Sequence, residues 1–135
     1  MATAHAVYLG ELRTKATHLQ SGSEIITDAP TDNHGKGEAF SPTDLVATAL
    51  GLCMMTTMGI VAERHGWELK GMNMDISKVM STDKPRRITE IHIKFDFNGM
   101  TLNDEQQVIL KNTALSCPVA HSLDPDIKQV VDLGF

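Results

Sequence analysis

The sequence predicts an α+β domain built around one long apolar helix, and three observations lead to this prediction. Residues 40–66 form the longest and most apolar stretch of the chain, with no charged side chain between Leu45 and Ala62. Residues 88–97 alternate apolar and polar side chains, which is typical of a strand with one buried and one solvent-facing side. The third observation is the order of segments: strands first, then a helix, a hairpin, a second helix and a last strand. This order is typical of an α+β domain.

The central helix is predicted over residues 42–64. Ser41 suits an N-cap, Pro42 suits the first helical position, and Asp44 falls where a carboxylate meets the positive end of the helix dipole. Gly66 is expected to end the helix. Its length, about 35 Å, is enough to cross a membrane. We favour a core helix, because Thr and Gly dilute its apolar character and neither flank is rich in Lys or Arg.

The apolar character of this helix extends to every side, so every side must be covered. One small sheet and one further helix of a 135-residue chain are too little to cover it. We therefore expect a homodimer whose subunits cover each other's central helices.

The segment before the helix is expected to open as a β-hairpin. Residues 4–19 alternate like a strand, with a change of parity at Gly10 that predicts a bulge or bend, and residues 24–27 return as the second strand. Residues 28–39 are rich in Pro, Asn, Asp and Gly and predict a loop. Glu38, near the end of this loop, lies close enough to the helix to reach a site at its start.

The segment after the helix supplies a second hairpin, a second helix and a last strand. Asn103 and Gln106 have the spacing of a capping box at the start of the second helix. The predicted hairpin consists of a strand over residues 67–80, with a break at Gly71, and its partner over residues 88–97. The helix is predicted over residues 103–116, a short helix over 118–123 and the last strand over 127–135.

Composition limits the function. Twelve Lys and Arg against 17 Asp and Glu leave a net charge of -5, which argues against nucleic acid or an anionic membrane surface as a partner. The first residues resemble no export signal, and two cysteines are too few for a secreted disulfide scaffold. We expect a single cytoplasmic domain over residues 1–135.

The two cysteines are the candidates for chemistry. Cys53 shares a helix face with Leu50 and Ile60, where a thiol can simply pack as a small apolar group; a reactive Cys53 needs a cation from elsewhere. Cys117 precedes Pro118, and at the start of a turn its thiolate could be stabilised. If the two helices pack together, the sulfurs come within disulfide reach, and such a pair can reduce peroxides.

A metal site is disfavoured. His121 could supply a ligand beside the two cysteines, but the chain has no Cys-x-x-Cys and no His-x-x-x-His. We therefore expect neither a metal nor a cofactor.

Two stretches, SPTDLVATALGLC, which ends at Cys53, and SCPVAHSL, which contains Cys117, resemble the OsmC/Ohr group of osmotically inducible and organic-hydroperoxide-resistance proteins. The element order agrees over essentially the whole chain. The resemblance implies the OsmC-like fold, an intertwined homodimer with active sites at the subunit interface, and a role in oxidative stress defence. It also implies thiol peroxidase activity on organic hydroperoxides, with Cys53 peroxidatic and Cys117 resolving.

The resemblance further implies an arginine that holds the thiolate, a role that only Arg13 can fill, and a glutamate near the helix start. Thr43 stands at the glutamate's position, which leaves Asp44 or Glu38 as substitutes. An external dithiol, in this group a lipoylated protein, is the implied reductant. The alternative is a non-catalytic protein of the same fold that holds a small apolar ligand at the dimer interface, and Thr43 is the feature that favours it.

Overall fold

The computed structural model describes all of residues 1–135. Its contacts divide the chain into two compact units, unit 1 (Met1–Val46) and unit 2 (Ala47–Phe135). Each unit is described by itself. The α+β class is confirmed, since both units carry a β-sheet and helices follow each sheet in the chain. The prediction of one domain over residues 1–135 stays a prediction.

Unit 1 holds a three-stranded antiparallel sheet in the order β1-β2-β3, formed by Ala4–Gly10, Arg13–His18 and Glu24–Asp28. The predicted hairpin is present, but the single strand predicted over residues 4–19 is two strands. Gly10, Glu11 and Leu12 all have left-handed φ angles, of 83°, 54° and 66°. Three such residues in succession reverse the chain, so the parity change is a full turn rather than a bend.

The loop after β3 contains a short 3-10 helix, η1 (Thr31–Asn33), and leads into α1. It closes on itself through backbone hydrogen bonds from Gly35 and Asn33 to the Pro30 carbonyl, at 3.0 and 2.9 Å. A Cβ at Gly35 would lie 1.6 Å from the Ala29 carbonyl oxygen, so no larger residue fits there. The predicted loop is confirmed, and its closed form fixes where Glu38 emerges.

Helix α1 runs from Pro42 to His65, close to its predicted bounds. Its start is a capping box: the Asp44 N–H donates to Ser41 Oγ at 3.0 Å, and the Ser41 N–H donates to Asp44 Oδ2 at 2.9 Å. Gly66, with a left-handed φ of 72°, follows the last helical residue. Asp44 therefore caps the start of α1.

By length and composition α1 could cross a membrane, with a mean hydropathy of 1.9 in its most apolar window, of which 33% is buried. Core helices of globular proteins pass the same test. One stripe of α1 packs into the core of unit 2, which is consistent with a core helix. The buried residues at helical spacing are Ala47, Leu50, Gly51, Met54, Met58 and Ala62.

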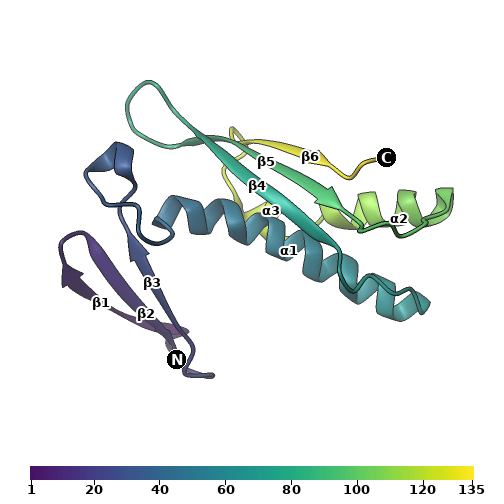
Figure 1. The fold of residues 1–135 in the computed structure, drawn as a ribbon, viewed down its shortest axis with the longest axis horizontal. Helices are drawn as coiled ribbons and strands as arrows, with labels where there is room; N and C mark the ends of the chain where they lie inside the picture. Colours follow the sequence, from purple (N-terminus) through teal and green to yellow (C-terminus); the bar gives the residue numbers. More distant parts are fainter. The chain divides into compact units, whose positions relative to one another are not determined.

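Unit 2 places α1 and α2 against one face of a second sheet, β4-β5-β6 (Figure 1). Its strands are Asn73–Met80, Ile88–Asp96 and Lys128–Asp132. β4 and β5 are antiparallel, whereas β5 and β6 are parallel and are connected through α2 (Asp104–Leu115) and α3 (Pro118–Ser122). As predicted, the capping box of Asn103 and Gln106 starts α2.

The predicted alternation in β5 is confirmed where it faces the helices: Ile91, Ile93 and Phe95 are buried. The predicted strand over residues 67–80 is shorter than expected, because β4 begins only at Asn73. A turn, closed by the Met72 N–H donating to the Leu69 carbonyl at 3.0 Å, occupies the residues before it.

Leu110 gives a direct test of this core. It is fully buried on α2, whereas Val108 on the same helix is 59% exposed. Leu110→Ala should lower the free energy of unfolding by about 3 kcal/mol, because it leaves a cavity. The matched change Val108→Ala should cost less than about 0.5 kcal/mol. Urea unfolding followed by circular dichroism measures both, and equal effects would contradict the packing described for α2.

Candidate functional site: a thiol pair and an arginine cluster

The thiol pair consists of Cys53 on α1 and Cys117 between α2 and α3, both within unit 2. Cys117 is fully buried among core residues, and Cys53, partly buried, packs against the same cluster. The two thiols are near neighbours, because Cys53 adds to the rise in the pKa of Cys117, and neither is in a disulfide. The packing of α2 and α3 with α1 has thus brought together two residues 64 positions apart.

Local structure explains where Cys117 lies. Ser116 ends α2, and Pro118 cannot continue its hydrogen-bond ladder but can begin α3. Cys117 is therefore the N-cap of α3, and its Sγ accepts a hydrogen bond from the Ala120 N–H at 3.3 Å. The break between helices that the sequence predicts is confirmed.

Burial raises the pKa of the Cys117 thiol above its ordinary value. The Ala120 N–H opposes this rise, and the Cys53 thiol adds to it. The stabilisation of the Cys117 thiolate that we expect at this turn is present in the Ala120 N–H, but burial outweighs it. Cys117 therefore keeps its proton at neutral pH.

The arginine cluster lies in unit 1 and centres on Arg13, the first residue of β2. Its Nη2 contacts Glu38 Oε2 directly and lies 3.7 Å from Asp28 Oδ2. The hydrogen bond that Arg13 donates to Glu38 is the main cause that raises the pKa of Arg13, with the charge of Asp28 adding to it. Of the two predicted partners, Glu38 is the one beside Arg13.

Asp44 and Thr43 both lie at the start of α1. Asp44 forms the capping box, and the hydroxyl of Thr43 lies 3.1 Å from that of Ser41. Residue 43 thus holds a hydroxyl where the resemblance implies a carboxylate.

Sequence reasoning missed Asp28, which we read as the first residue of a loop. It ends β3 and lies opposite Arg13 in the β2-β3 register. Counting the cross-strand pairs outward from the turn between β2 and β3 would have placed the two side by side.

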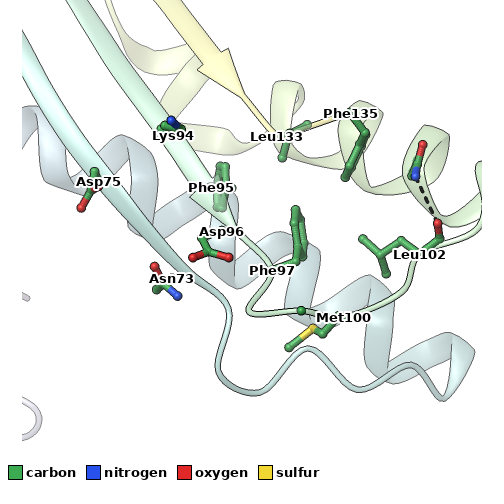
Figure 2. A pocket seen from close by; sticks show the side chains of 13 residues that line it. Asn73, Asp75, Lys94, Phe95, Asp96, Phe97, Met100, Leu102, Leu133 and Phe135 are labelled. Carbon is green, nitrogen blue, oxygen red and sulfur yellow. Dashed lines mark hydrogen bonds between the residues drawn. The ribbon is translucent and has the colours of Figure 1, made fainter.

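A cavity of about 560 Å³ in unit 2 lies at the carboxyl end of β5 (Figure 2). Phe97 and Phe135 form part of its wall, with ring centroids 5.7 Å apart, and the carboxylates of Asp75 and Asp96 lie on another side. Neither cysteine lines it. No group of three His, Cys, Asp or Glu side chains in the chain could hold a metal ion.

The family model of OsmC-like proteins matches residues 35–131, which include both cysteines. A Psychrobacter arcticus 273-4 structure is 54% identical over 98% of this chain and 95% of that one, with a TM-score of 0.94. That protein is provisionally described as an osmotic stress induced and detoxification response protein. A search of the curated proteins gave no match.

More distant structures share the fold. The organic hydroperoxide resistance protein OsmC of Legionella pneumophila is 17% identical over 98% of both chains, with a TM-score of 0.67. OhrB of Bacillus subtilis, an organic hydroperoxide resistance protein, is 16% identical over 98% of both chains, also with a TM-score of 0.67.

The unequal burial of the thiols predicts how they react with N-ethylmaleimide. In the reduced native protein Cys53 should be modified before Cys117. Modification of Cys117 should rise about tenfold per pH unit through the neutral range, because the reactive thiolate fraction grows until pH reaches the raised pKa. Peptide mass spectrometry with denatured protein as the control measures both rates, and earlier modification of Cys117 at pH 7 would contradict the geometry.

Proposed function

Because the chain belongs to the OsmC-like family, we propose that it is a thiol-dependent peroxidase that reduces organic hydroperoxides. The observation that carries the proposal is the packing of Cys53 and Cys117 in one core cluster with unequal burial. A peroxidase of this kind needs one sulfur within reach of substrate and a second within reach of the first. The names of the Legionella pneumophila and Bacillus subtilis proteins support organic hydroperoxides as the substrate class.

In the first step the Cys53 thiolate attacks the terminal oxygen of the hydroperoxide. The O–O bond breaks, Cys53 becomes a sulfenic acid, and the alkoxide leaves and takes a proton to give the alcohol. Cys53 takes this role because it is partly exposed, whereas Cys117 is buried and protonated. The apolar residues around the pair favour an organic over an inorganic peroxide.

In the second step Cys117 loses its proton and attacks the sulfur of the Cys53 sulfenic acid. A disulfide forms and hydroxide leaves, which the released proton converts to water. The two sulfurs are close enough for Cys53 to affect the pKa of Cys117, so they need only a small movement to bond. An external dithiol, which we propose to be a lipoylated protein, then reduces the disulfide.

Arg13 is proposed to stabilise the Cys53 thiolate, with Glu38 orienting its guanidinium in place of the glutamate that Thr43 replaces. The Arg13–Glu38 contact supports this assignment. Asp44, the other candidate, is occupied at the start of α1. We propose that the protein works in the cytoplasm, where a dithiol reductant keeps such thiols reduced.

The proposal includes a homodimer. α1 leaves Leu52 and Ile60 about half exposed, at 52% and 47%, and these apolar residues lie outside its buried stripe. All of β1 except Gly10, which is partly buried, is exposed, including Val7 and Leu9. Apolar surface of this extent is typical of an interface, and a second copy of the chain would cover it.

Leu52 gives a test of the dimer. Leu52→Glu should weaken self-association at least about tenfold, because it buries a charge in the interface. The matched change Val108→Glu, on the exposed side of α2, should leave association unchanged. Analytical ultracentrifugation measures both, and a wild-type chain that sediments as a monomer at micromolar concentration would contradict the dimer.

The cysteine variants test the two chemical roles. Cys53→Ser should lower peroxide consumption to the rate of the buffer alone. Cys117→Ser should react with one equivalent of cumene hydroperoxide within about threefold of the wild-type rate, but should stop at a sulfenic acid that dimedone traps. Mass spectrometry of the dimedone adduct identifies the residue, and an adduct on Cys117 in Cys53→Ser would reverse the roles.

Thr43 is the observation that favours the second candidate function, a binding protein that holds a small apolar ligand at the dimer interface. Without a carboxylate at that position the site lacks one part of the implied peroxidase arrangement. In that case both cysteine variants would leave ligand binding intact and the wild-type chain would consume no hydroperoxide.

A further inference from the structure

Asp28 is a buried carboxylate that the fold alone does not explain. It is only 1% exposed, and its Oδ1 has no hydrogen-bond partner. Burying a carboxylate with an unpaired oxygen is costly, and native proteins keep few such groups. A group of this kind calls for a role that offsets its cost.

The contacts of the Asp28 carboxylate lead to the arginine cluster. It is the cross-strand neighbour of Arg13, and its Oδ2 lies 3.7 Å from Arg13 Nη2. The same Oδ2 accepts a hydrogen bond from the Glu38 N–H at 3.0 Å. The Asp28 N–H donates to the Phe40 carbonyl at 3.1 Å, which closes the loop just before α1. One buried residue therefore contacts both members of the Arg13–Glu38 pair.

Glu38 is nearer to Arg13 and has the larger effect on its pKa, but it is exposed to solvent. Its side chain is 57% exposed, and Arg13 is 32% exposed. An exposed ion pair contributes little and is screened by salt, whereas a buried carboxylate is screened much less. The backbone of Glu38 is itself held by Asp28, so the position of the nearer carboxylate depends on the buried one.

We propose that Asp28 is the positioning residue of the arginine cluster: its buried charge holds the Arg13 guanidinium, and its hydrogen bond sets Glu38 beside it. This rests on the proposed role of Arg13 at the Cys53 thiolate. Asp28 touches neither substrate nor sulfur in this account, and it acts through Arg13.

Asp28→Asn isolates the charge, because a carboxamide oxygen can still accept the Glu38 N–H. The probe is the hydrogen exchange rate of the Arg13 Nε–H group, measured by ¹⁵N NMR and assigned by its loss in Arg13→Ala. Exchange should accelerate about tenfold in Asp28→Asn, the effect of losing a hydrogen bond or ion contact to a charged group. The matched, equally isosteric change Glu38→Gln should accelerate it less than about threefold.

A second measurement of Arg13 exchange uses only the wild-type protein, so it does not depend on whether a variant folds. Raising NaCl from 0.1 to 1 M shortens the screening length from about 10 to about 3 Å and weakens exposed pairs. If Asp28 holds Arg13, exchange should change less than about twofold. A tenfold acceleration by salt, or by Glu38→Gln with Asp28→Asn unchanged, would overturn the proposal.

Cys53 oxidation by cumene hydroperoxide, measured in Asp28→Asn and Arg13→Ala, separates this proposal from the proposed function. If Cys53 oxidation slows equally in the two variants, and Arg13 exchange accelerates in Asp28→Asn, the result supports both the proposed function and the role of Asp28. Slowing in Arg13→Ala alone, with Arg13 exchange unchanged in Asp28→Asn, overturns the role of Asp28 and leaves the peroxidase intact. No slowing in Arg13→Ala overturns the role of Arg13, and with it any positioning role of Asp28 in the reaction.

Discussion

The packing of one stripe of α1 is the constraint on which unit 2 depends. Leu50, Met54 and Met58 on that stripe belong to one buried cluster with β5 and α2. Because α2 must pack in this cluster, the break between α2 and α3 falls beside α1, and Cys117 is buried next to Cys53. The stripe lies on only one side of α1, so the same helix supplies both Cys53 and the apolar surface that a second copy would cover.

The two sulfurs belong to the same kind of side chain and differ in how deeply they are buried. Burial raises the pKa of Cys117 and keeps it protonated, whereas Cys53 lies at the edge of the buried stripe and is partly exposed. In the proposed reaction this difference assigns the first attack to the sulfur that a substrate can reach. The proposal also has the second thiol react only after the sulfenic acid has formed beside it, which limits competing oxidation of Cys117.

Local signals predicted much of the fold: the cap of Asn103 on α2, the break before Pro118, and the alternation in β5. The parity change at Gly10 predicts a bulge or bend where the chain makes a full turn, since alternation alone cannot distinguish a bulge from a tight turn. The effect of burial on the Cys117 thiol could not be predicted, because it depends on residues distant in the chain. Asp28 was missed because loop composition follows it and hides its cross-strand pairing with Arg13.

The most direct test of the central claim is peroxide consumption by the reduced wild-type protein. Cumene hydroperoxide is supplied with dihydrolipoamide as reductant, and non-reducing mass analysis of the same sample follows the thiols. We predict sustained consumption, and a disulfide between Cys53 and Cys117 when the dithiol is left out. No consumption, with both thiols still free, would contradict the peroxidase and would leave a protein that shares the family's fold without its chemistry.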